Sequence, residues 1–78
     1  MEYQGKHYYK VDVFDARHGY SFVMATNEKL DDEYDVVELA LDKGLFQDDF
    51  DADRAIVDDL ISEYDIKAFM DAGCVFNV

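Results

Sequence analysis

The chain has 78 residues, of which 50% are apolar, and a formal net charge of −12. This length accommodates a single domain, residues 1–78, and the apolar content is too high for an acidic disordered tail. No stretch approaches the roughly 20 apolar residues that cross a bilayer, and the N-terminus lacks a signal-peptide pattern, so we expect a cytoplasmic protein without membrane association.

Two segments near the N-terminus alternate apolar and polar residues with the period of a β-strand. They are residues 7–15 and 20–26, joined by a short connector that ends in Gly19. This pattern predicts an antiparallel β-hairpin.

The predicted hairpin carries aromatic rings on both faces. Tyr9, Val11 and Val13 point to one face, and Tyr8 and Phe14 to the other. If helices cover only the first face, Tyr8 and Phe14 are exposed and become secondary candidates for partner binding. The alternatives are that they are buried in a two-sided core or in a homodimer formed through the hairpin face.

A helix is predicted over about residues 32–43. Asp31 or Asp32 suits its N-cap, and Gly44 suits the position after its end. Apolar residues recur at helical spacing, which predicts a core-facing stripe that contains Tyr34, Val37 and Leu41.

The remainder of the chain predicts a second helix and a final strand. The second helix begins near Asp51 or Asp53 and buries an apolar face made of Ile56, Val57, Leu60, Ile61 and Tyr64. For residues 66–72 we favour a short helix over a loop, and the alternating residues 74–78 predict a third strand beside the hairpin. The predicted fold class is therefore α+β, a three-stranded antiparallel sheet with two or three helices on one face.

The negative charge is confined to the middle of the chain. Residues 1–27 and residues 66–78 are each neutral, whereas residues 28–65 hold fifteen acids against three bases. A solvated acidic face that maintains solubility is one explanation. Adaptation to high salt is a weaker one, because it predicts acids over the whole surface.

Several motifs suggest chemistry, but each lacks a necessary residue. Residues 49–60 match a calcium loop at Asp49, Asp51 and Asp53, yet Arg54 replaces the turn glycine and Leu60 the bidentate glutamate. No His or Cys pair has zinc-site spacing, and no nucleophile or phosphate-loop motif is present. We therefore expect no catalytic residue, metal or cofactor, and no enzyme.

Two smaller features have structural interpretations as well. Asp15, Arg17 and His18 could form an acid–base cluster, but a hairpin tip offers no burial to shift a pKa. Cys74 lies in an apolar run without a basic neighbour, which favours a buried structural thiol.

The acids of DDEYDVVELALD and DDFDADRAIVDDLISEYD give the chain a class resemblance to small acidic phage and mobile-element proteins that mimic DNA. Such proteins inhibit CRISPR effectors or restriction enzymes. The resemblance implies that the protein occupies the basic nucleic-acid groove of an effector and does not bind nucleic acid itself. The alternative is an antitoxin-like module that binds a basic protein unrelated to nucleic acid. The expected partner-binding acids are Asp31, Asp32, Glu33, Asp35, Glu38, Asp42, Asp48, Asp49, Asp51, Asp53, Asp58, Asp59 and Glu63.

Overall fold

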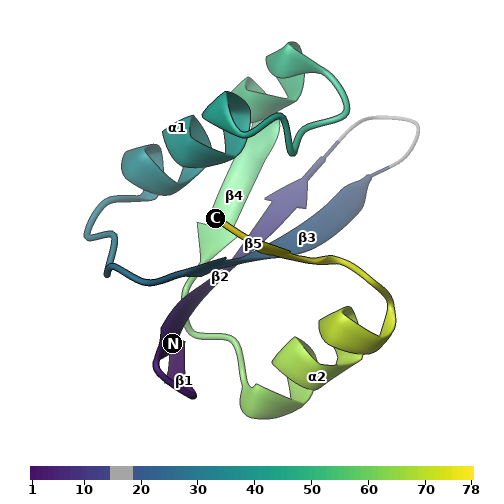
Figure 1. Cartoon of the computed structure of the whole chain (residues 1–78). Helices are drawn as coiled ribbons and strands as arrows, with labels where there is room; N and C mark the ends of the chain where they lie inside the picture. The colour runs from purple at the N-terminus through teal and green to yellow at the C-terminus, as the bar shows by residue number, and fades with distance from the viewer. Residues whose placement is uncertain (15–18) are drawn as a thin grey trace.

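Two antiparallel strands form the centre of the sheet (Figure 1). In the computed structural model, which describes residues 1–14 and 19–78, β2 (Lys6–Val13) pairs with β3 (Tyr20–Thr26), with Val11 opposite Phe22. The predicted hairpin is confirmed, while most of its connector lies outside the described residues. A Cβ at Gly19 would lie 2.8 Å from the carbonyl oxygen of Val13, so this close approach requires glycine.

Three short strands extend this pair at both edges. β1 (Glu2–Tyr3) and β4 (Ala55–Asp58) both pair antiparallel with β2, along successive parts of its length. β5 (Val75–Asn77) pairs with β3 in the parallel direction. The described part of the chain therefore forms a mixed five-stranded sheet, where the sequence predicted three antiparallel strands.

The predicted second helix is wrong over residues 55–62, because residues 55–58 form a strand, residues 59–62 have no regular structure, and Leu60, expected in the core, is exposed. A short 3-10 helix, η1 (Asp49–Arg54), occupies the predicted start, and β4 follows directly. Val57 packs on the core while Ile56 is exposed, which is strand alternation. The helical spacing of these residues fits a strand followed by a turn equally well, and pairing with β2 satisfies the backbone of the segment.

The two α-helices lie on opposite faces of the sheet, not on one face as expected (Figure 1). α1 (Glu33–Asp42) connects β3 to β4, and α2 (Glu63–Asp71) connects β4 back to β5. The connection from β3 to β4 crosses the sheet in one direction, and the connection from β4 to β5 crosses it in the opposite direction. Each of these connections joins two strands that run parallel to each other. Because such crossovers are almost always right-handed, opposite directions place their helices on opposite faces.

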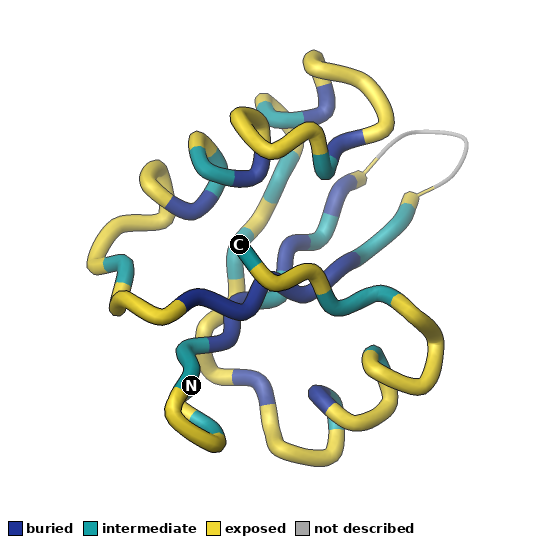
Figure 2. The backbone as a smooth tube through the Cα atoms, in the orientation of Figure 1, coloured by how far each residue is buried: buried dark blue, intermediate teal, exposed yellow. Residues whose placement is uncertain are grey.

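Each helix covers its own apolar cluster, and many of the buried residues lie along β2 and β3 (Figure 2). α1 contributes Val36 and Ala40 to the first cluster. α2 and the segment before it contribute Ile66 and Ile61 to the second. The sheet residues of the first cluster are Tyr9, Val11, Val13, Phe22 and Met24, and those of the second are Tyr8, Val23 and Ala25.

Both helices begin at a side chain that caps the backbone. Asp32 accepts a hydrogen bond from the backbone N–H of Tyr34 at 3.0 Å, which confirms the predicted start of α1. Ser62 and Asp65 form a reciprocal capping box at the start of α2, and this helix confirms the one favoured for residues 66–72. Tyr64 projects outward instead of entering the core as expected, with 80% of its surface exposed.

Candidate functional site

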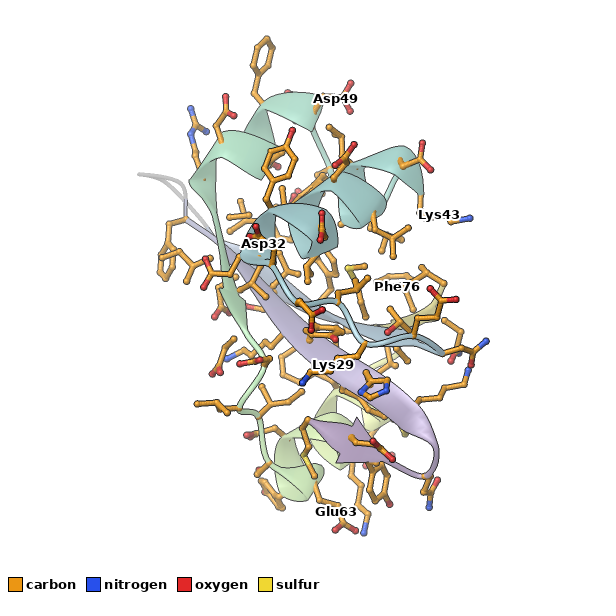
Figure 3. All side chains as sticks on the ribbon, turned by 90° about the vertical axis from the view of Figure 1, so that its left-hand side faces the viewer. Lys29, Asp32, Lys43, Asp49, Glu63 and Phe76 are labelled. Carbon is orange, nitrogen blue, oxygen red and sulfur yellow. The ribbon has the colours of Figure 1, made fainter. Side chains whose placement is uncertain are left out.

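The acids expected to bind a partner lie in three places: on α1 and just before it, on η1 and just before it, and between the last residue of β4 and the first residue of α2. All are exposed except Asp51. Figure 3 shows Asp32, just before α1, and Asp49, the first residue of η1, in the same half of the molecule, with Glu63, the first residue of α2, at the opposite end. The fold therefore groups most of these acids and separates Glu63 from them.

A small hollow brings together acids from two distant parts of the sequence. Asp31, Asp32 and Glu33 at the start of α1 line it together with Asp59, which follows β4. Its volume is about 100 Å³. The pairing of β4 with β2 makes this possible, because it carries the second acidic segment to the N-terminal end of α1.

A larger groove lies beside it between α1, η1 and β4, and we call it the α1–β4 groove. Its volume is about 520 Å³. Asp32, Glu33 and Val57 line both hollows, so the two are continuous. The lining residues are Asp32, Glu33, Tyr34, Val37, Glu38, Leu41, Ala52, Asp53, Ala55 and Val57.

The apolar side of this groove was not predicted as a surface. Tyr34, Val37 and Leu41 have the spacing expected of a core stripe, but Tyr34 is 70% exposed and Leu41 is 40% exposed. The helix is rotated so that Val36 and Ala40 contact the sheet. Small side chains allow a helix to approach the sheet closely, and Ala40 is the signal that could have indicated this orientation.

Asp51 is buried and has a structural partner. Its carboxylate accepts a hydrogen bond of 2.6 Å from the hydroxyl of Tyr20, which in turn accepts one of 2.9 Å from the backbone N–H of Gln47. Burial raises the pKa of Tyr20 above its ordinary value, and the hydrogen bond to Asp51 raises it further. Asp51 therefore supports the fold and is not presented to a partner.

Several of the exposed acids also serve local structure. Asp48 caps η1, and Asp58 accepts a hydrogen bond from the backbone N–H of Leu60 at 2.8 Å. Glu63 forms an ion pair with Lys67 at 3.2 Å, and this contact is the main cause of the raised pKa of Lys67. These contacts fix the carboxylates in position without removing them from solvent.

The two aromatic candidates of the hairpin have different environments. Tyr8 is only 4% exposed because α2 covers it, so it is a core residue and the hairpin face around it is closed. Phe14 is 62% exposed just beyond the end of β2. Of the alternatives left open by the sequence, burial in a two-sided core therefore holds for Tyr8, and Tyr8 is wrong as a partner-binding candidate.

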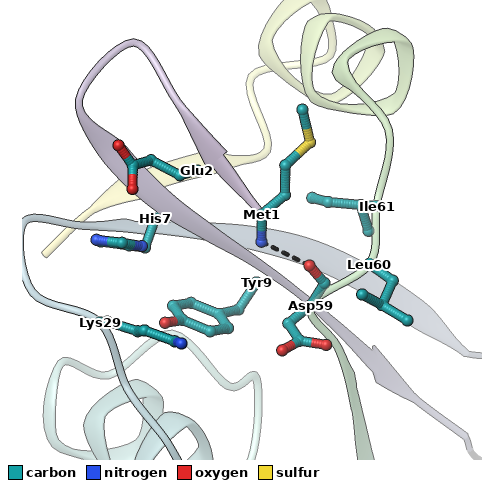
Figure 4. A pocket seen from close by; sticks show the side chains of 8 residues that line it. All are labelled: Met1, Glu2, His7, Tyr9, Lys29, Asp59, Leu60 and Ile61. Carbon is teal, nitrogen blue, oxygen red and sulfur yellow. Dashed lines mark hydrogen bonds between the residues drawn. The ribbon is translucent and has the colours of Figure 1, made fainter.

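A third hollow, of about 510 Å³, lies where β1, β2 and the residues after β4 meet (Figure 4). Basic His7 and Lys29 and acidic Glu2 and Asp59 all line it, and the backbone nitrogen of Met1 donates to the carbonyl oxygen of Asp59. Across residues 1–14 and 19–78, no three His, Cys, Asp or Glu side chains are grouped so that they could hold a metal ion. The charges in this hollow are mixed, and it offers no cluster of one sign.

Three further sequence predictions concern Cys74, the hairpin connector and membrane association. Cys74 is only partly buried, and its thiol lies 3.6 Å from the carbonyl oxygen of Ala72, so the expected burial is incomplete. The cluster of Asp15, Arg17 and His18 lies outside the described residues. Within the described part of the chain, no helix has the length and apolar character to cross a membrane.

A comparison of the chain with protein-family models, with curated proteins and with solved structures finds no match. Functional inference therefore depends on the surface geometry of this chain alone.

Proposed function

We propose that this protein is an acidic inhibitor that occupies the basic nucleic-acid groove of an effector of the CRISPR or restriction type, acting as a DNA mimic. The observation that carries the proposal is the convergence of Asp31, Asp32 and Glu33 with Asp59 around one hollow. Carboxylates from segments about 30 positions apart in the sequence form one acidic surface on a folded scaffold.

A rigid acidic surface can compete with nucleic acid for the same site. Proteins bind nucleic acid through arrays of Lys and Arg, and much of the affinity comes from neutralised phosphates. Opposite charge also accelerates encounter, so an acidic protein reaches such an array quickly. A net charge of −12 disfavours direct binding of nucleic acid, whose phosphates carry the same sign.

The local roles of these acids support a defined geometry. Asp32, which lines both hollows beside α1, is held by its capping hydrogen bond. Side chains with fixed positions lose less conformational entropy on binding than free ones.

The experiment measures competition with nucleic acid. Nucleic-acid-binding CRISPR and restriction effectors are titrated with the protein in the presence of labelled duplex DNA, and release of the DNA is recorded. We expect displacement by the wild type. Displacement by Asp31→Lys/Asp59→Lys should require at least about tenfold more protein, which corresponds to about 1.4 kcal/mol.

The matched control is Glu28→Lys/Asp71→Lys, which changes the net charge equally at exposed positions that line none of the three hollows described above. A similar loss in both variants would show that net charge matters and the acidic surface does not. Binding to a basic protein without displacement of DNA would instead favour the antitoxin-like alternative.

A further inference from the structure

We propose that the α1–β4 groove receives an aliphatic side chain from a basic peptide segment of the partner protein, with Lys or Arg on either side of that chain. This inference rests on the proposed function only for the basic character of the partner. It adds an apolar anchor to a surface that the DNA-mimic proposal describes by charge.

The groove has an apolar wall and floor. Tyr34, Val37 and Leu41 lie along one side of α1, and β4 contributes Ala55 and Val57 beneath them. Tyr34 is 70% exposed and Leu41 is 40% exposed, so this side of α1 leaves apolar surface in contact with water. Burying that surface against another apolar group is favourable because it removes apolar area from water.

The charges around the groove select the sign of the partner. Asp32, Glu33, Glu38 and Asp53 are among its lining residues, and none of the lining residues within the described ranges 1–14 and 19–78 is basic. A second copy of this chain would place acids against acids, which repel. A segment with Lys or Arg flanking the aliphatic residue pairs with these carboxylates instead.

The side-chain chemistry of Lys and Arg suits both parts of the surface. Their methylene stems can lie along apolar surface while the charged ends reach carboxylates. Central apolar anchors with a polar rim are the usual arrangement of residues that dominate binding energy at protein interfaces. A surface that only mimics DNA phosphates requires no apolar centre. The apolar groove therefore distinguishes binding of a peptide side chain from contact by charge alone.

The test uses the whole protein and three labelled peptides of equal length. The first carries Leu at helical spacing among Lys residues, the second replaces each Leu with Ser, and the third replaces each Lys with Glu. Binding is measured by fluorescence anisotropy at physiological salt, and the contact surface is mapped from amide chemical-shift changes. We expect the Leu/Lys peptide to bind at least about tenfold more tightly than the Lys/Ser peptide and the Leu/Glu peptide not to bind.

Two variants of identical composition separate the groove from general apolar contact. Tyr34→Gln/Leu41→Gln removes apolar side chains of the groove. Leu60→Gln/Tyr64→Gln removes the same residue types at more exposed positions outside it. Thermal melts establish that both variants are folded. We expect the first to weaken Leu/Lys binding at least about tenfold and the second to change it less than about twofold.

Equal effects of the two variants, or equal binding of the Leu/Lys and Lys/Ser peptides, would overturn the groove proposal. Amide chemical-shift changes centred away from Val37 and Val57 would also overturn the groove proposal. The DNA-competition experiment is independent of these results. Loss of competition in Asp31→Lys/Asp59→Lys with normal competition by Tyr34→Gln/Leu41→Gln would leave the inhibitor proposal standing and remove this one.

Discussion

Tyr20 connects parts of the chain that the sequence keeps apart. Its ring belongs to β3, its hydroxyl donates to Asp51 in η1, and the same oxygen accepts a hydrogen bond from the Gln47 backbone. These two hydrogen bonds hold η1, and with it one wall of the α1–β4 groove, against β3, in addition to the packing of Ala52 on the first core cluster.

The first prediction is that Tyr20→Phe destabilises the fold by about 1–3 kcal/mol, because a carboxylate with little exposure and a backbone N–H both lose a partner. The measurement is the free energy of unfolding from urea titration. Tyr34→Phe is the control, since Tyr34 is exposed and its substitution should change stability by less than about 0.5 kcal/mol. Equal stability of the two variants would contradict this role of Tyr20.

The raised pKa of Tyr20 also predicts a dependence on alkaline pH. The folded protein retains the phenolic proton in a range where the unfolded chain, with an ordinary value near 10, has lost it. This contribution to stability is complete below pH 10 and disappears as pH rises through the raised pKa. Between pH 9 and 11 the wild type should lose stability faster than Tyr20→Phe, as measured by urea titration at each pH. Parallel curves would contradict the linkage.

At the level of elements, α2 shows how a small shift of helical phase decides which residues are buried. Ile66 is fully buried against Val23 and Ala25, whereas Tyr64, two positions earlier, projects into solvent. The capping box fixes where the helix begins, and the hydrogen bonds from Ser62 hold the pKa of Asp65 below its ordinary value.

This arrangement predicts opposite outcomes for two truncations. Ile66→Ala should lower the free energy of unfolding by about 2–5 kcal/mol, because it leaves a cavity under α2. Tyr64→Ala should change it by less than about 0.5 kcal/mol, although sequence periodicity assigned Tyr64 to the core. Denaturant titration of both variants provides the measurement, and a larger loss for Tyr64→Ala would show that the helix phase is wrong.

The elements that sequence analysis identified correctly are those with local signals. The hairpin follows from strict alternation, and α1 from its N-cap at Asp32 and the glycine at position 44. Residues 55–58 were misassigned because four residues are too few to separate strand from helix periodicity, and pairing with β2 decides between them.

In the candidate site, too, features with local sequence signals could be predicted and features that depend on long-range contacts could not. Exposure of acids on α1 could be predicted from their positions on a helix. The burial of Asp51 could not, because its partner Tyr20 lies 31 positions away. The α1–β4 groove also depends on long-range contacts, since it exists only where β4 reaches α1.

For the molecule as a whole, charge and size together determine how the acids interact. The principal extents are 34 × 24 × 19 Å, and the Debye length is about 30 Å at 0.01 M salt but about 8 Å at 0.15 M. At low salt nearly every acid therefore repels every other. At physiological salt only neighbours such as those around the two hollows beside α1 do so.

The last prediction follows from this comparison of lengths. Adding NaCl from about 0.01 to 0.2 M should stabilise the protein by about 1 kcal/mol or more, a rise in Tm of about 4–8 °C for a domain of this size. The rise should flatten above that range, because screening is then nearly complete, whereas stabilisation by excluded co-solutes continues to molar concentrations. Binding to a basic effector should respond in the opposite direction and weaken over the same range, since screening there removes attraction. Circular dichroism melts and effector titrations in the same buffers provide the measurement. A Tm that does not change below 0.2 M would show that the acids are already compensated in the folded protein, and the charge argument for the acidic surface would then lose its physical basis.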